Sequence, residues 1–186
     1  MVAALTKRLA QAKRRIAKLE ARADTDYLLD VPNRRGFERE LARSIAYAKR
    51  YRASAALLIV DVDGLKPVND RFGHAAGDHV LKAVVGVLSR NIRESDMLGR
   101  LGGDEFGILL WNLGEEEALA KAAALERVVD ATACEYRGRR IPHGISIGVT
   151  VLDADDKAAT ALERADRAMY ARKQSRRQKR TATVRR

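Results

Sequence analysis

Apolar residues recur three and four positions apart over much of the chain, and this spacing is typical of helices with one buried face. The longer helices are predicted over residues 2–23, Arg34 to Tyr51, Gly77 to Leu88, Glu115 to Ala131 and Ala158 to Lys173. A short helical segment is also expected near Pro67 to Phe72. The residues beyond Lys173 are polar and basic, and we expect them to be disordered.

Three further patterns predict strands. Ala55 to Val60 is a continuous apolar run that ends in Asp61, which is typical of a buried central strand delivering a carboxylate at its end. Met97 to Leu101 and Phe106 to Trp111 flank an acidic, glycine-containing turn and predict a hairpin. Ile141 to Leu152 alternates between apolar and polar positions. Strands interleaved with helices predict an α/β or α+β sandwich with one sheet.

The apolar positions of the first helix form a narrow seam with heptad-like spacing. The seam consists of Val2, Leu5, Leu9, Ala12, Ile16, Leu19 and Ala23. It spans about three repeats, and so narrow a stripe is marginal as a single helix in water. We therefore interpret residues 1–25 as a coiled-coil dimerisation stalk, with the alternative that they fold back on their own domain. Residues 26–177 then form one domain, and residues 178–186 form a basic tail that we expect to be disordered.

Composition narrows the classes of protein that fit. The 186 residues suffice for one domain with a well-buried core and a short appendage. The net charge of +11 suits a nucleic-acid-binding protein, but much of the excess lies at the two ends, and few aromatic residues interleave with the basic ones. A basic protein can equally bind a polyphosphate substrate. No apolar run is long enough to span a membrane and Cys134 lacks a disulfide partner, so we expect a cytoplasmic protein.

Carboxylates stand at two places that the predicted sheet could bring together. Asp61 ends the first strand, and Asp104 and Glu105 follow the pair Gly102-Gly103 in the hairpin turn. Glycines at a turn allow positive φ and a close approach of a phosphate to the backbone. If the two places meet, their oxygens suit Mg²⁺, and the cluster would resemble a polymerase palm acting on a nucleotide. The alternative is a solvated surface hairpin, with Asp61 capping the next segment.

Four blocks in order resemble the GGDEF domain, the catalytic domain of diguanylate cyclases, from near Asp26 to Arg177. The blocks are Val31-Pro32-Asn33-Arg34-Arg35, Asp61 to Asp78, Arg93 to Phe106, and Ser146-Ile147-Gly148-Val149 followed by Ala165 to Tyr170. The resemblance implies an α+β sandwich whose central, mostly antiparallel five-stranded sheet is flanked by helices, as in nucleotidyl cyclases and the polymerase palm. It also implies Mg²⁺-dependent condensation of two GTP molecules into cyclic di-GMP and two pyrophosphates by a homodimer of half-sites.

The resemblance also implies roles for individual positions. Asp61 and Asp104 would be carboxylate ligands of Mg²⁺, which Mn²⁺ could replace, and the Val62 carbonyl would be a further ligand. Glu105 would assist metal binding or deprotonate the attacking 3′-hydroxyl. The substrate-binding positions would be Asn69 and Asp78 for the guanine edge, Lys66, Lys173 and Arg177 for the phosphates, and Gly102 and Gly103 in the turn. The pair Asn69 and Asp78 could otherwise serve turn formation and helix capping.

Arg93 and Asp96 stand where product-inhibited cyclases carry an RxxD site, so the resemblance implies that they bind cyclic di-GMP. An i,i+3 surface salt bridge is the alternative interpretation. Arg172 and Arg176 replace the usual alanine and glycine of the last helix, and their charge could support triphosphate binding or crowd the phosphate-contacting residues. Two rival functions stay open: a cyclic di-GMP or GTP receptor without catalysis, and a nucleic-acid-binding protein supported only by the basic tail.

Overall fold

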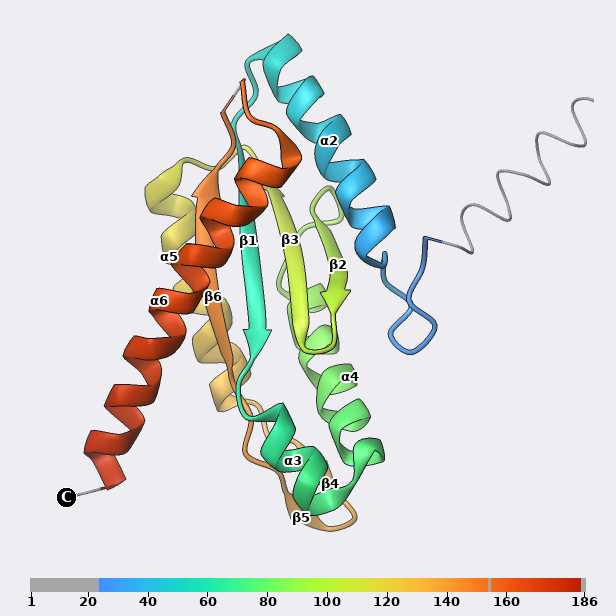
Figure 1. Cartoon of the computed structure of the whole chain (residues 1–186), viewed down its shortest axis with the longest axis vertical. Coiled ribbons are helices and arrows are strands. Elements are labelled where there is room, and N and C mark those ends of the chain that lie inside the picture. Colours follow the sequence, from blue (N-terminus) through green and yellow to red (C-terminus); the bar gives the residue numbers. More distant parts are fainter. Residues whose placement is uncertain (1–23, 154, 185–186) are drawn as a thin grey trace, which may run out of the picture.

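The computed structural model describes residues 24–153 and 155–184. The predicted helix over residues 2–23, and with it the coiled-coil stalk, lies outside the described residues. The described part is a sheet with helices on both faces (Figure 1). Among the described helices, none is long and apolar enough to cross a lipid bilayer.

The central sheet consists of antiparallel strands in the order β2-β3-β1-β6. The strands are β1 (Ala55–Val62), β2 (Met97–Gly102), β3 (Glu105–Trp111) and β6 (Ile145–Val151). Because β1 is flanked by β3 and β6 and covered on both faces, all of its residues are buried, as its continuous apolar run predicted. β6 lies at an edge of the sheet, so one side of its backbone must be satisfied by groups other than a strand.

The α+β class agrees with the sequence interpretation, but the strand count does not. Over the described residues the main sheet has four strands instead of the expected five. The chain before β6 forms a separate two-stranded ladder of β4 (Glu135–Tyr136) and β5 (Arg139–Arg140), and β6 begins only at Ile145. These two-residue strands carry Glu and Arg and contribute only Tyr136 to the core, and Pro142 lacks the N–H that would continue a ladder towards them.

Two long helices cover each face of the sheet. α2 (Arg34–Tyr51) and α6 (Ala158–Val184) lie on one face, and α4 (His74–Arg90) and α5 (Glu115–Ala131) lie on the other (Figure 1). The alternation of side chains along β1 serves both faces, since Leu57 packs in the core beneath α2 and α6, and Leu58 packs in the core beneath α4 and α5. The short helix α3 (Leu65–Phe72) follows β1 and leads into α4.

The last helix is longer than the sequence predicted. α6 continues to Val184, so the expectation of disorder beyond Lys173 is wrong as far as that residue. Residues 174–184 contain no Gly or Pro and are rich in Gln, Arg and Lys, which are good helix formers. A polar, highly charged segment can therefore be helical when it continues a helix whose earlier turns pack against the sheet.

A glycine fixes where α6 lies on the sheet. A Cβ added to Gly148 of β6 would lie 2.1 Å from the backbone nitrogen of Met169 and 2.2 Å from the carbonyl oxygen of Ala165. Only glycine permits so close an approach of the helix backbone to the strand. The contact holds α6 against β6 one helical turn before Lys173.

Candidate functional site

The carboxylates at the end of β1 and in the hairpin turn come together. Asp61 pairs in register with Glu105, and the N–H of Val62 donates to the carbonyl oxygen of Asp104 at 3.0 Å. Burial raises the pKa of Asp61, a neighbouring ammonium group lowers it, and the negative charge of Asp104 raises it again. The two carboxylates therefore lie at one end of the sheet, near enough for the charge of one to affect the other.

The hairpin turn differs from the expected glycine turn. β2 ends at Gly102 and β3 begins at Glu105, so the turn residues are Gly103 and Asp104. Neither glycine is among the described residues with positive φ, and a Cβ on Gly103 would meet no atom within 4 Å. The backbone conformation does not require these glycines. Their effect is to leave the turn backbone uncovered, which suits the close approach of a ligand.

Side chains from outside the turn hold it in place. Arg100 donates to the Gly103 carbonyl from Nη2 at 2.7 Å and from Nε at 3.2 Å, and its Nη1 donates to Asp26 Oδ2 at 3.0 Å. Arg34, the first residue of α2, donates from Nε to the Leu101 carbonyl at 2.6 Å. These charge-assisted contacts tie the hairpin to the segment around α2, so that the turn has a fixed place relative to β1.

Two hollows open beside the turn, and Asp104 and Lys66 line both of them. The hollow next to α6 has a volume of about 320 Å³, and we call it the α6 hollow. It contains the three residues predicted to contact phosphates: Lys66, Lys173 and Arg177. The hollow between α3 and α4 has a volume of about 490 Å³, and we call it the α3–α4 hollow. It contains the two residues predicted to read a base: Asn69 and Asp78.

Close packing of α3 against α4 fixes Asn69 in the α3–α4 hollow. A Cβ on Gly77 would lie 1.9 Å from Asn69 Oδ1, so glycine at this position leaves the room that the amide occupies. Asn69 Oδ1 is buried and has no hydrogen-bond partner among the described residues. Leaving a buried amide oxygen unpaired costs free energy, so this position favours a ligand that brings a hydrogen-bond donor.

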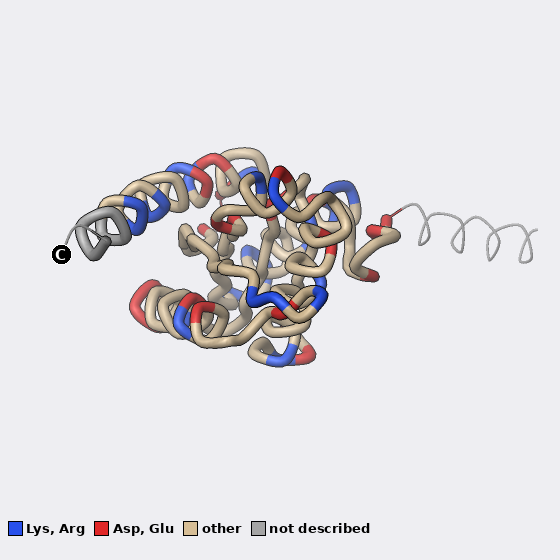
Figure 2. Tube along the Cα trace, turned by 90° about the horizontal axis from the view of Figure 1, so that it is seen from below, with Lys and Arg blue, Asp and Glu red and all other residues tan. Residues whose placement is uncertain are grey.

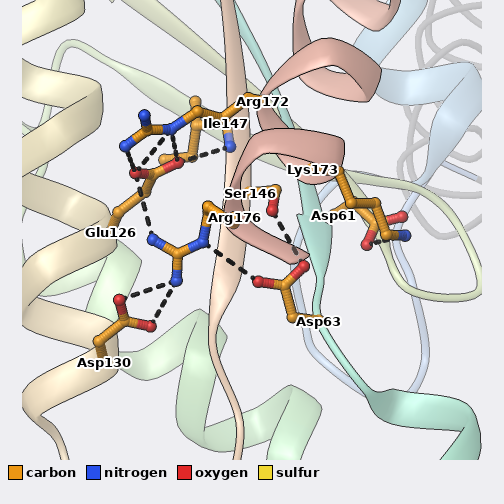
Figure 3. Close-up of polar contacts among 9 residues, drawn as sticks. All are labelled: Asp61, Asp63, Glu126, Asp130, Ser146, Ile147, Arg172, Lys173 and Arg176. Atoms are coloured by element: carbon orange, nitrogen blue, oxygen red, sulfur yellow. Dashed lines mark hydrogen bonds and ion pairs between the residues drawn. The ribbon is translucent and has the colours of Figure 1, made fainter. Parts of the chain in front are cut away.

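Lys173, which lines the α6 hollow, forms an ion pair with Asp61 at the end of β1. Lys173 Nζ lies 2.5 Å from Asp61 Oδ1, with both side chains largely buried (Figure 3). Asp61, Asp104 and the Val62 carbonyl offer hard oxygen donors, which fit Mg²⁺. Within residues 24–153 and 155–184, no three His, Cys, Asp or Glu side chains are grouped as a metal site. An ion held here would therefore depend on backbone and ligand oxygens in addition to the carboxylates.

Glu105 lies beside Asp61 but lines a third hollow. This hollow has a volume of about 210 Å³, faces α2 and α6, and is also lined by Arg34 and Asp166. Burial raises the pKa of Glu105, and the negative charges of Asp166, Asp61 and Asp104 raise it further. A carboxylate with a raised pKa is suited to take up a proton closer to neutral pH.

Arg93 and Asp96 lie in the loop between α4 and β2. Asp96 Oδ2 accepts from the N–H of Arg93 at 2.9 Å, and Oδ1 accepts from the N–H of Trp111 at 3.1 Å. The carboxylate thus ties this loop to the end of β3, which differs from the i,i+3 salt bridge considered from the sequence. Arg93, Asp96 and Trp111 also line a hollow of about 400 Å³, separate from the three described above.

Sequence reasoning missed three buried polar residues near the α6 hollow. Asp63 accepts from Ser146 Oγ at 2.9 Å, and Glu126 of α5 is only 3% exposed. Asp63 could have been found as the second carboxylate of an alternating pair after a buried strand. Ser146 could have been found as a hydroxyl in an apolar strand. Nothing in the pattern around Glu126 distinguished it from a solvated glutamate.

Arg172 and Arg176 were expected to support triphosphate binding or to crowd the phosphate-contacting residues. Arg172 instead donates to Glu126, and Arg176, although it lines the α6 hollow, donates from Nη2 to both carboxylate oxygens of Asp130 at 2.8 Å. Their charge is therefore directed at α5 and, through Arg176 Nε, at Asp63 Oδ2, which lies 3.4 Å away. Figure 2 shows the basic residues recurring along the described C-terminal turns of α6.

Comparisons with known proteins agree with this fold. The family model described as "Diguanylate cyclase, GGDEF domain" matches residues 23–179. The chain is 38% identical over 171 residues to diguanylate cyclase TpbB of Pseudomonas aeruginosa, covering 90% of this chain and 39% of TpbB. It is 32% identical over 154 residues to diguanylate cyclase DgcP of the same species, covering 83% of this chain and 23% of DgcP. The chain thus spans less than half the length of these curated relatives.

Two solved structures are similar over most of their length. One is the coiled coil and GGDEF domain of DgcB from Caulobacter crescentus, solved in complex with c-di-GMP. It superposes on this chain with a TM-score of 0.82 at 25% sequence identity, and the match covers 94% of this chain and 93% of that one. The other is the GGDEF domain of TpbB from Pseudomonas aeruginosa, which superposes with a TM-score of 0.76 at 36% sequence identity. This match covers 81% of this chain and 89% of that one. Family match, sequence identity and fold therefore agree: the chain belongs to the GGDEF domain family of diguanylate cyclases.

Proposed function

We propose that the chain is the catalytic domain of a diguanylate cyclase, which joins two GTP molecules into cyclic di-GMP and releases two pyrophosphates. The observation that supports this most directly is the arrangement around Asp104. A polar hollow with an unpaired amide oxygen lies on one side, and a hollow lined by cations lies on the other. A GTP substrate places the reaction in the cytoplasm.

Recognition of guanine is assigned to the α3–α4 hollow. The Asp78 carboxylate can accept hydrogen bonds from guanine N1–H and the exocyclic amine, a pattern that adenine does not offer. Asn69 Oδ1, buried without a partner, gains a donor from the base edge. The volume of about 490 Å³ is of the size found for small-molecule sites.

Binding of the triphosphate is assigned to the α6 hollow. Lys66, Lys173 and Arg177 supply positive charge, which offsets the charge on the phosphates. Asp61, Asp104 and the Val62 carbonyl would hold a divalent ion, Mg²⁺ or Mn²⁺. When bound, the ion supplies charge neutralisation at the phosphate under attack.

Each condensation step makes one bond and breaks one. The 3′-oxygen of one GTP forms a bond to the α-phosphorus of the other, the bond from that phosphorus to the bridging oxygen breaks, and pyrophosphate leaves. The proton of the 3′-hydroxyl passes to a base, and Glu105 is the candidate because its pKa is raised beside the other carboxylates.

Because the product has two-fold symmetry, we assign one GTP to each of two facing domains. Residues 1–25 are the proposed link between them, raising the effective concentration of one domain at the other. Deleting residues 1–23 should make the specific activity fall strongly on dilution, and an unchanged specific activity on dilution would rule out this role.

The deciding experiment is incubation of the full chain with GTP and Mg²⁺, with the product identified by mass. Cyclic di-GMP is expected from the unmodified chain, with a loss of about a hundredfold to a thousandfold in the rate for Asp104→Ala. Glu116→Ala, which removes an exposed carboxylate on α5, is the matched control and should leave the rate unchanged. Binding of GTP without any product would support the receptor alternative instead.

Feedback by the product is assigned to Arg93 and Asp96. The structures of DgcB from Caulobacter crescentus contain c-di-GMP, and in this chain the two residues line a hollow of about 400 Å³. The exposed guanidinium of Arg93 could present its planar fork to a guanine or a phosphate. Arg93→Ala should relieve inhibition by added cyclic di-GMP while the initial rate is kept. An unchanged inhibition constant would exclude this site.

A further inference from the structure

The last turns of α6 carry cations on two different sides. Arg172 and Arg176 point towards α5, where they meet Glu126 and Asp130, whereas the neighbouring Lys173 points towards Asp61 at the end of β1 (Figure 3). The two groups belong to adjacent residues of one helix. The side that binds α5 therefore determines where the other side can lie.

Glu126 joins three layers of the fold at the sheet edge. Its Oε1 accepts from the N–H of Ile147 at 3.1 Å, a backbone donor on edge strand β6, and also from Arg172 Nε at 3.0 Å. Its Oε2 accepts from Arg172 Nη2 at 2.5 Å. This carboxylate, which is only 3% exposed, thus contacts the edge strand β6 and joins α5 on one face of the sheet to α6 on the other. A buried carboxylate depends on its cation, since removing one partner leaves the other charge uncompensated.

The apolar core does not hold the part of α6 that carries Lys173. Met169 is the last buried residue of this helix within the described part of the chain. Beyond it, α6 forms ion pairs with the rest of the fold: Arg172 with Glu126, Lys173 with Asp61, and Arg176 with Asp63, Asp130 and Glu126. The position of these turns therefore depends on ion pairs and not on fully buried apolar side chains.

We propose that Glu126 and Arg172 form a positioning clamp that places Lys173 at the triphosphate end of the site. The inference rests on the proposed function, in which Lys173 contacts the phosphates. Arg172 does not touch the nucleotide in this scheme and acts only through the helix turn that it shares with Lys173.

A double-mutant cycle tests whether Arg172 acts through Lys173. The affinity of the full chain for the α,β-methylene analogue of GTP, which cannot release pyrophosphate, is measured by calorimetry with Mg²⁺ for the unmodified chain, Arg172→Ala, Lys173→Ala and the double variant. We expect each single variant to bind about tenfold more weakly, which corresponds to one charge-assisted contact. The double variant should bind no more weakly than Lys173→Ala alone, because the clamp then has nothing to position.

Three further variants separate the clamp from general loss of structure. Arg167→Ala, the same substitution at an exposed position of α6, should leave the affinity unchanged. Glu126→Gln keeps an acceptor for the Ile147 N–H but removes the charge that binds Arg172, so it should weaken binding to the same extent as Arg172→Ala. Arg172→Lys keeps the charge but loses the two-point contact, and should be intermediate. These two near-isosteric variants carry the test if Arg172→Ala fails to fold, which thermal melting will show.

The outcomes distinguish this inference from the function on which it rests. Additive losses in the cycle, or an affinity unaffected by Arg172→Ala and Glu126→Gln, would overturn the clamp even if the unmodified chain forms cyclic di-GMP. Failure of the unmodified chain to bind the analogue would overturn the proposed function and the clamp together. Non-additive losses with unchanged melting temperatures would establish a positioning role that a merely structural residue would not show.

Discussion

The two hollows beside Asp104 are built in different ways. The α3–α4 hollow takes the two residues predicted to read a base from one short stretch of chain, where packing at Gly77 leaves a fitted space for Asn69, and it adds Arg100 and Asp104 from the hairpin. The α6 hollow depends on a contact between Asp61 and Lys173, which are 112 positions apart in the chain. Steric fit between neighbouring helices therefore fixes the side chains of the α3–α4 hollow. Ion pairs between distant elements fix those of the α6 hollow. The first suits discrimination between bases, whereas the second supplies charge whose placement depends on the rest of the fold.

The largest expected effect is on the preference for GTP over ATP, which separates recognition of the base from binding of the phosphates. Asp78→Ala should reduce the preference for GTP over ATP by about a hundredfold, because its carboxylate accepts from donors that only guanine presents. Lys173→Ala should lower the affinity for both nucleotides about tenfold and leave the preference for GTP unchanged, because a phosphate contact does not distinguish the bases. Competition binding of both nucleotides to each variant measures the two effects. A change in preference in Lys173→Ala would show that the hollows are not independent.

A smaller effect is expected from filling the space beside Asn69. Gly77→Ala would place a Cβ 1.9 Å from Asn69 Oδ1, so the amide must move, and the affinity for GTP should fall about tenfold, by roughly the worth of one hydrogen bond to the base. Gly86→Ala on the same helix is the matched control, because its Cβ would lie 3.4 Å from the flexible end of Arg90. It should leave affinity unchanged and stabilise the fold by about 0.5–1 kcal/mol, since alanine favours a helix interior. Equal losses of affinity in the two variants would contradict the steric account.

The smallest expected effect is on the stability of the fold and comes from the burial of Glu105 beside other carboxylates. Burial and neighbouring carboxylates raise the pKa of Glu105 in the folded chain, so the stability linked to this group is fully present below its ordinary pKa of 4.5 and is lost as pH rises through the raised value. Glu105→Gln should therefore raise the melting temperature by a few degrees at neutral pH without metal, and the difference should vanish at acidic pH. Glu116→Gln, at an exposed position, should show no such difference. A melting temperature lowered at neutral pH would mean that Glu105 is held by favourable contacts instead.

Several candidate site residues were predicted from the sequence because their signals are local. Asp61 ends a continuous apolar run, and Asp104 follows two glycines between two strand-like segments, so the sequence allowed the two to meet at one edge of the sheet, with a solvated hairpin as the alternative. Asn69 and Asp78 lie on a short helix and on the helix that follows it, and both line the same hollow. The details of the turn were not predictable, because its glycines adopt no positive φ and the turn falls one residue later than the glycine pair.

What the sequence determined by itself is the order of the elements, the burial of β1 and the family, since these follow from periodicity and from motifs a few residues long. Only the tertiary structure decided that Glu126 is buried, that Arg172 binds Glu126 of α5, that α6 continues past Lys173, and that the main sheet has four strands over the described residues. The physical reason is that a charged side chain looks solvated in any local pattern. Its burial depends on a partner of opposite charge, which for Arg172 and Glu126 lies 46 positions away.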